Sequence, residues 1–418
     1  MCNGAGVCRK LRTGTMCPSF MATGDEEHST RGRANALRLV LSGVLPPEEL
    51  TGRRLFDTYA LCLECKGCKA ECPSNVDVAK LKMEFLDGYY RKHGAPLGVR
   101  MMGHAAALNR LGSTLAPVSN WAAKLPGAGW LAEKLLGIDR RRALPRFHRN
   151  HFRKWFEGRA NAASPAQGSR LASEAANRRV PIVLLDDCLT SFCEPSVNRA
   201  AVAVLEAAGH EVHLAGLACC GRTLASKGFL AEAQDLAREN LERLKKWTDE
   251  GVNIVGCEPS CVAMLIDEYL DLVPGSTSRA VAERTFLIDT HLVRSGARLE
   301  LRPGSTSNRI VLHGHCHQKA LVGIEDTRAA LAMIPGAEVN TLDSGCCGMA
   351  GSFGYEHFEL SMKIGERVLF PAVRSQPEAA IAAPGFSCRH QIHDGTGRQA
   401  KHPIEILAEQ LVGQAPRA

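Results

Sequence analysis

The cysteines are the residues of this sequence whose spacing could do chemistry. One run follows the pattern C-x2-C-x2-C-x3-C-P and consists of Cys62, Cys65, Cys68, Cys72 and Pro73. In this pattern three thiolates hold one iron–sulfur cluster and the fourth thiolate crosses to another cluster. The run therefore predicts at least one 4Fe-4S cluster. A zinc site is the alternative, because zinc needs only four ligands.

The N-terminus supplies cysteines that could complete these sites. Ala5 stands where the middle thiolate of a C-x2-C-x2-C run would fall. Under the crossing rule, one complete four-ligand set consists of Cys17, Cys62, Cys65 and Cys68. The second set, which is one ligand short, consists of Cys2, Cys8 and Cys72. A 3Fe-4S cluster, a cube with a non-cysteine ligand and no cluster are all open for this second set.

A second group of ten cysteines begins at Cys188, after a stretch without any. It contains two Cys-Cys-Gly triplets, and each triplet follows a predicted strand. Thirty residues separate Cys188 from Cys219 and 29 separate Cys316 from Cys346, which indicates an internal repeat. The candidate ligands of the first repeat are Cys188, Cys219, Cys220, Cys257 and Cys261, with Cys193 spare. Those of the second repeat are Cys316, Cys346, Cys347 and Cys388.

The two repeats are not expected to be chemically equal. Spacing pairs Cys388 with Cys257, so the second repeat lacks a closing thiol equivalent to Cys261. Three histidines bracket Cys316 and could ligate or relay protons, although hydrogen-bonded turn histidines are the preferred interpretation. They are His313, His315 and His317.

Composition limits the function classes. The 17 cysteines are about 4% of 418 residues, below the roughly 8–10% of a disulfide scaffold. No secretion signal or membrane span is evident, so a reducing cytoplasmic compartment is expected. Residues 91–160 carry 14 Lys/Arg against three acidic residues. A solvated basic face is the simplest interpretation, and docking to a partner protein or peripheral association with an anionic membrane is the alternative. Nothing indicates nucleic-acid binding.

The elements that must position these cysteines suggest an α+β multidomain chain. Residues 1–90 are expected to form an α-helical ferredoxin-type module that includes a helix over 46–63, and 91–177 a basic helical arm with a hinge at 158–177. Apolar runs alternating with helical patterns, such as a strand over 309–312 and a helix over 229–248, predict parallel βα units in 178–300 and 301–418. Both repeats would then place their thiols at the carboxyl edge of a parallel sheet, where α/β proteins bind their ligands.

The ferredoxin-type run followed by two Cys-Cys-Gly repeats resembles the heterodisulfide-reductase-type iron–sulfur family. More narrowly, residues 2–8, 16–20 and 28–34 look like the iron–sulfur half of proteins that fuse it to a flavin-binding D-2-hydroxyacid dehydrogenase. The iron–sulfur subunits of glycolate oxidase and of anaerobic glycerol-3-phosphate dehydrogenase are related. Because the likeness begins at residue 2, a split gene or part of a larger fusion is expected.

This resemblance implies an oxidoreductase component that passes electrons from a partner's flavin through Cys17, Cys62, Cys65 and Cys68 to a quinone or an electron-transfer protein. It also implies clusters at the Cys-Cys-Gly motifs. FAD is expected on the partner, because this chain has no P-loop and no dinucleotide fingerprint. Two alternatives stay open: a thiol/disulfide oxidoreductase of the heterodisulfide-reductase type, and a non-enzymatic metal-binding regulatory protein.

Overall fold

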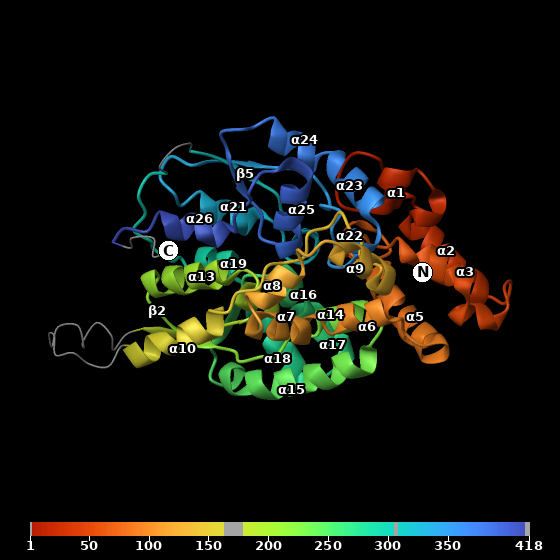
Figure 1. Cartoon of the computed structure of the whole chain (residues 1–418), viewed down its shortest axis with the longest axis horizontal. Helices are drawn as coiled ribbons and strands as arrows, with labels where there is room; N and C mark the ends of the chain where they lie inside the picture. Colours follow the sequence, from red (N-terminus) through yellow and green to blue (C-terminus); the bar gives the residue numbers. More distant parts are fainter. Residues whose placement is uncertain (1, 163–178, 305–307, 414–418) are drawn as a thin grey trace.

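The computed structural model describes residues 2–162, 179–304 and 308–413. It combines helices with parallel strands, as the sequence predicted. Figure 1 shows the N-terminal helices in red and orange at one end of the molecule. The first repeat, in green, and the second, in blue, lie side by side beyond them.

The N-terminal module is helical. Side-chain caps fix the start of two of its helices: Ser29 accepts from the amide of Gly32, and Asp77 accepts from the amide of Lys80. The sequence predicted one helix over 46–63, but Gly52 divides this segment in two. The elements are η1 (Val7–Arg9), α1 (Pro18–Thr23), η2 (Glu26–His28), α2 (Thr30–Leu41), η3 (Pro47–Thr51), α3 (Arg53–Ala60), α4 (Gly67–Glu71) and α5 (Val78–His93).

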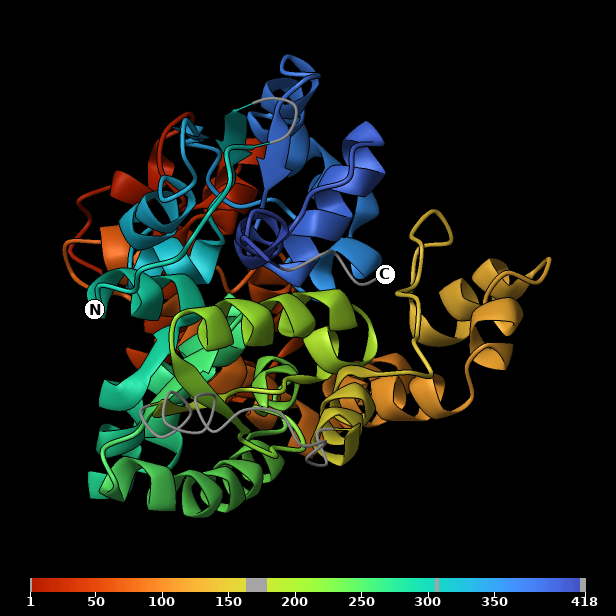
Figure 2. The ribbon, with the colours of Figure 1, turned by 90° about the vertical axis from the view of Figure 1, so that its left-hand side faces the viewer.

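The basic arm forms a chain of short helices that flanks both repeats, and Figure 2 shows part of it, in orange and gold, extending from the side of the molecule. Its elements are α6 (Leu97–Gly103), α7 (Ala105–Thr114), α8 (Val118–Ala122), α9 (Ala128–Leu136) and α10 (Phe152–Ala162). None of the helices in the described ranges is long and apolar enough to cross a membrane. Residues 158–162 of the expected hinge lie in α10, and 163–177 lie outside the described residues.

Two arginines of the arm are structural rather than solvated. The Arg142 side chain is fully buried and bonds Asp394 at 2.7 Å and the Ser361 hydroxyl at 2.7 Å. Arg153 pairs with Asp186 at 2.6 Å. The interpretation of the arm as a solvated basic face is therefore wrong at these two positions, because their partners lie on the two repeats.

The first repeat contains a four-stranded parallel sheet in the order β2-β1-β3-β4. Its strands are β1 (Val180–Leu184), β2 (His210–Leu214), β3 (Asn253–Gly256) and β4 (Thr285–Leu287). Its helices are α12 (Cys188–Phe192), α13 (Pro195–Ala207), α14 (Arg222–Ser226), α15 (Leu230–Asp249), α16 (Pro259–Ala263), α17 (Tyr269–Leu272), α18 (Ser276–Arg284) and α19 (Ile288–Arg294), with the π-helical turn η4 (Met264–Glu268) between α16 and α17.

The second repeat contains a three-stranded parallel sheet in the order β6-β5-β7. This order matches β2-β1-β3, and Lys401 bridges to Ala382 at the place of a fourth strand. The strands are β5 (Arg309–Leu312), β6 (Glu338–Thr341) and β7 (Ala380–Ala382). The helices are α20 (Cys316–Leu321), α21 (Glu325–Leu331), α22 (Phe353–Glu356), α23 (Phe358–Glu366), α24 (Leu369–Arg374), α25 (Phe386–Thr396) and α26 (Pro403–Glu409).

One hydrophobic core joins the two repeats. Leu184 and Val255 of the first sheet belong to the same buried cluster as Leu312 and Ala382 of the second. The apolar strand residues that predicted a buried sheet therefore also hold the two sheets together, which fixes the relative position of their carboxyl edges.

Candidate metal centres

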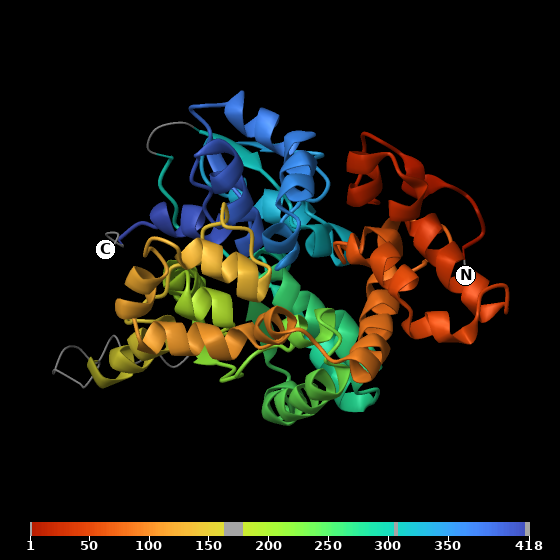
Figure 3. The same cartoon turned by 45° about the vertical axis from the view of Figure 1, so that its right-hand side comes forward.

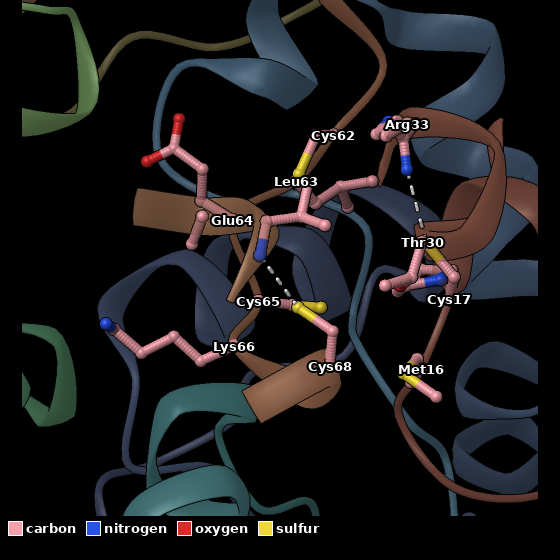
Figure 4. Close-up of a pocket in the computed structure, with 13 residues that line it drawn as sticks. Met16, Cys17, Thr30, Arg33, Cys62, Leu63, Glu64, Cys65, Lys66 and Cys68 are labelled. Carbon is pink, nitrogen blue, oxygen red and sulfur yellow. Dashed lines mark hydrogen bonds between the residues drawn. The ribbon is translucent and has the colours of Figure 1, made fainter. Parts of the chain in front are cut away.

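The N-terminal module gathers four cysteines from two separate segments. Figure 4 shows their side chains around one pocket. The four are Cys17, Cys62, Cys65 and Cys68, and all are buried. This is the complete set that the crossing rule predicted.

Two hydrogen-bond donors are directed at the sulfurs of this set. Arg33 is fully buried, and its guanidinium donates to the Cys17 sulfur at 3.4 Å. The amide of Val78, at the start of α5, donates to the Cys68 sulfur at 3.4 Å. Burial raises the pKa of the Cys68 thiol to about 12, so this thiol stays protonated at neutral pH until a metal displaces the proton.

The loop between Cys62 and Cys68 has an unusual backbone. Glu64 and Lys66 have φ values of 53° and 58°, in the left-handed region that non-glycine residues rarely occupy. The ammonium group of Lys66 is fully buried and contacts Asp267 and Glu268, each at 2.6 Å, and these contacts hold the residue in this conformation. The cluster loop is therefore fixed by the π-helical turn of the first repeat.

The second N-terminal set is more loosely placed. Cys8 is buried, whereas Cys2 and Cys72 are half-buried. The η1 turn that carries Cys8 lies against α4, which ends next to Cys72. Burial raises the pKa of Cys8. Cys8 belongs to the same buried cluster as Cys17, and Cys2 and Cys72 pack against that cluster.

The first Cys-Cys-Gly repeat assembles four thiols at the carboxyl edge of its sheet. The Cys220 thiol donates to the Cys261 sulfur at 3.2 Å, and the Cys188 and Cys219 thiols are also in hydrogen-bond contact. Gly221 has a φ of 87°, and its amide donates to the Cys219 sulfur at 3.3 Å. The glycine thus allows the turn that brings both neighbouring thiols to one site.

Cys257 lies apart from these four thiols. Its side chain is packed in the apolar core shared by the two sheets, and its carbonyl accepts from His402 Nε2 at 3.0 Å. Cys188, Cys219, Cys220 and Cys261 belong to a different buried cluster. The structure therefore separates Cys257 from the set to which the spacing assigned it.

The second repeat builds an equivalent site from Cys316, Cys346, Cys347 and Cys388. The Cys346 thiol is in hydrogen-bond contact with the thiols of Cys316 and Cys347, and the Cys347 thiol is in hydrogen-bond contact with that of Cys388. Gly348 repeats the turn, with a φ of 94° and an amide that donates to Cys346 at 3.4 Å.

The helix positions change the expected pairing of cysteines between the repeats. Cys261 is the third residue of α16, and Cys388 is the third residue of α25, so these two are equivalent. Cys257, directly after β3, corresponds to Ala383, directly after β7. The second repeat therefore has its closing thiol, and the inequality expected from its absence is wrong.

The three histidines around Cys316 have different roles. His315 caps α20 by accepting from the amide of His317. His317 Nε2 lies 2.9 Å from the carbonyl oxygen of Glu64, in the N-terminal cluster loop. For these two the prediction of hydrogen-bonded turn histidines is confirmed. His313 is fully buried beside Cys347 and Cys388.

The N-terminal set and the second repeat meet directly. Cys65 shares a small buried cluster with Cys316 and Cys346, and the Cys65 and Cys316 thiols act electrostatically on each other. Arg222, at the start of α14, acts electrostatically on both Cys220 and Cys316. Figure 3 shows the red and orange N-terminal module approaching both repeats.

Sequence reasoning missed the charged residues of this junction. Arg222 follows the first Cys-Cys-Gly triplet directly, and Glu64 and Lys66 lie between cluster cysteines. Arg222 pairs with Glu64 and Glu268, and Lys82 pairs with Glu64 at 3.4 Å. Their position next to predicted ligands was the available signal.

The residues present fit iron–sulfur centres. Each of the three complete sets offers four buried thiols, and backbone amides already donate to sulfurs in all three. Thiolates with such donors are the usual ligands of iron–sulfur clusters.

Comparison with known families agrees with this geometry. Residues 1–77 match a 4Fe-4S dicluster domain, and residues 182–266 and 310–393 each match a cysteine-rich domain. The second match covers both repeats, so the duplication predicted from spacing is confirmed.

Several curated proteins are similar over most of the chain. D-2-hydroxyglutarate dehydrogenase from Pseudomonas putida is 28% identical over 98% of this chain and 43% of its own length. The chain thus spans less than half of that relative. One subunit of the anaerobic glycerol-3-phosphate dehydrogenase from Escherichia coli K12 is 27% identical over 74% of this chain and 76% of its own. A probable glycolate oxidase iron–sulfur subunit from Bacillus subtilis is 24% identical over 94% and 90%.

Proposed function

Because the chain belongs to the family that joins a 4Fe-4S dicluster domain to two cysteine-rich domains, we propose that it is the iron–sulfur electron-transfer part of a flavin-dependent 2-hydroxyacid dehydrogenase or oxidase. The substrate is a hydroxyacid of the 2-hydroxyglutarate, glycolate or lactate class. FAD resides on a partner domain or subunit, and a quinone or an electron-transfer protein accepts the electrons.

The observation that carries this proposal is the buried cluster that Cys65 shares with Cys316 and Cys346, in which the Cys65 and Cys316 thiols act electrostatically on each other. Candidate ligands of two different centres share one buried cluster, although more than 240 residues separate them in the chain. A protein that only stored or sensed metal would have no need to place two centres in contact.

The chain's own residues suit this role. When bound, iron–sulfur clusters supply one-electron carriers that divide the two electrons of a reduced flavin. Arg33 and the amide of Val78 stabilise negative charge on the thiolates. Burial of the cysteines excludes water, which strengthens these interactions. Lys66 holds the loop of Cys65 against the repeats.

The test uses the full chain, purified and reconstituted without oxygen and mixed with its flavoprotein partner. Adding a 2-hydroxyacid should bleach the iron–sulfur absorbance only when the flavoprotein is present. Cys65→Ser should abolish this reduction, whereas Cys193→Ser should not, because the buried Cys193 lies at the end of α12 and the charges that act on its thiol are those of Glu194 and Asp187.

Three outcomes would contradict the proposal. Zinc without acid-labile sulfide would favour a regulatory metal protein. Reduction of a disulfide by the chain itself would favour a thiol/disulfide oxidoreductase. Iron–sulfur centres that stay oxidised with the reduced flavoprotein would exclude electron transfer from flavin.

A further inference from the structure

His313 is a buried imidazole that the proposed function leaves without a role. It follows β5 directly and has no exposed surface. A ring nitrogen of His313 and the sulfurs of Cys347 and Cys388 all lie within 4.8 Å of one another. Its ring interacts with the Cys347 thiol, and among the described residues its Nε2 has no other hydrogen-bond partner.

The opposite side of the ring is fixed. His313 Nδ1 lies 2.6 Å from the Ser344 hydroxyl. When Nδ1–H donates to this hydroxyl, the Nε2 lone pair is left for the thiols. Metal-binding histidines usually have their other ring nitrogen held in this way, because the bond sets both tautomer and orientation.

The first repeat provides an internal comparison. Leu185 follows β1 as His313 follows β5. The amide of Leu185 donates to Val255 at 2.8 Å, and the amide of His313 donates to Ala382 at 2.9 Å, so the two residues hold the same place in their sheets. The two sites have equivalent thiols. The second site has the nitrogen donor of His313 at the position where the first site has the apolar side chain of Leu185.

We propose that His313 Nε2 is a ligand of an iron–sulfur centre at the second Cys-Cys-Gly site, beside Cys347 and Cys388. This rests on the proposed function only in requiring iron–sulfur clusters. The site offers four thiols and an imidazole, which is more than the four ligands that a zinc ion takes. The thiols form a row of neighbours in the order Cys316, Cys346, Cys347 and Cys388, and such a row suits a centre with several metal ions.

The test does not need turnover. The full chain is prepared without oxygen with ¹⁴N- or ¹⁵N-histidine, reduced, and measured by pulsed EPR for nitrogen coupling. A histidine coupling that changes with the isotope is expected. It should disappear in His313→Leu, which copies the first repeat, and persist in His317→Gln, a buried neighbour bonded to Glu64. Redox titration should show that one potential changes in His313→Leu.

Several results would overturn the proposal. One is iron–sulfur signals without histidine coupling in the wild-type chain, a measurement that no misfolded variant can affect. Another is coupling that persists in His313→Leu or in Cys346→Ser/Cys347→Ser, which lacks two ligands of the site. Zinc bound at this site would also overturn the proposal. In the first two cases electron transfer from the flavoprotein would still be observed, so failure here is distinguishable from failure of the proposed function.

Discussion

At the residue scale, Arg33 makes a specific prediction about the N-terminal cluster. Its buried guanidinium bonds Cys17 and the carbonyl oxygens of Thr58 and His28. Arg33→Met removes a buried positive charge beside anionic sulfurs, so adding an electron becomes less favourable. We expect a lower reduction potential of this cluster in EPR-monitored redox titration.

The control for this variant is Arg53→Met. Arg53 is exposed and pairs with Asp57 at 2.9 Å, away from the cysteines. Its substitution should leave the potential unchanged. An unchanged potential in Arg33→Met, with full iron content, would show that this guanidinium does not act on the cluster.

The residue types of the sites were largely predictable, but their partners were not. The spacing of Cys62, Cys65 and Cys68 is a local pattern, and the crossing rule added Cys17 to their set. Arg142 looked like a surface cation, because nothing in the sequence indicates that Asp394 lies beside it. Pairing Cys388 with Cys257 failed although the spacing favours Cys261: 40 residues separate Cys347 from Cys388, and 40 separate Cys220 from Cys261.

At the element scale, the two Cys-Cys-Gly turns offer a matched pair of substitutions. Gly221 and Gly348 both have positive φ, which costs an L residue about 1–2 kcal/mol. A Cβ at Gly348 would lie 2.4 Å from the Ser361 carbonyl oxygen, whereas at Gly221 the nearest atoms are at 3.6 Å. Gly348→Ala should therefore lower the free energy of unfolding more than Gly221→Ala.

Urea unfolding of the two variants, with iron content of the folded chains, checks this expectation. Gly348→Ala should also lose iron from the second site, because Ser361 lies in α23 and cannot shift without moving that helix. Equal stability losses in the two variants would mean that the second turn relaxes without cost.

The strands and helices show where a local sequence pattern was sufficient to predict a secondary-structure element. The predicted strand over 309–312 agrees with β5 in both bounds, because a short apolar run between polar residues is typical of a buried parallel strand. The predicted helix over 229–248 agrees with α15 within one residue at each end. The single helix expected over 46–63 failed at Gly52, where the chain leaves the helical conformation before α3 begins.

A histidine pair between β2 and α19 predicts how stability depends on pH. His210 Nε2 and His291 Nε2 lie 3.2 Å apart and are buried. Burial lowers the pKa of both, and that of His291 to about 4. Between about pH 6.5 and pH 4 the unfolded chain therefore binds protons that the folded chain excludes. Stability should be intact above pH 6.5 and fall as the pH drops through this window.

Calorimetric Tm measurements from pH 7 to pH 5 test this dependence. His291→Gln should reduce the fall in Tm, whereas His393→Gln, at an exposed position, should not change it. A Tm that falls equally steeply in wild type and His291→Gln would assign the pH dependence to other groups.

At the scale of the whole molecule, the position of the N-terminal module depends on a network of buried charges. Lys66 contacts Asp267 and Glu268, and Arg222 joins Glu268 to Glu64. This network links the cluster loop to the first repeat, while His317 links the same loop to the second. Local sequence patterns do not predict these pairings, because Glu64 and Glu268 are 204 residues apart in the chain.

Lys66→Met therefore tests whether the network holds the centres in contact. The variant leaves two buried carboxylates short of a cation, and breaking a buried ion pair costs about 3–5 kcal/mol. Because Lys69, Lys80 and Arg222 still contact these carboxylates, we expect about 3 kcal/mol. We also expect faster proteolytic release of the N-terminal module and slower reduction of the second site.

Lys69→Met, at a partly exposed position that contacts only Asp267, should have a much smaller effect on all three measurements. Wild-type stability and reduction rates in Lys66→Met would mean that the apolar contacts around Cys65 and Cys316 are sufficient to position the two centres.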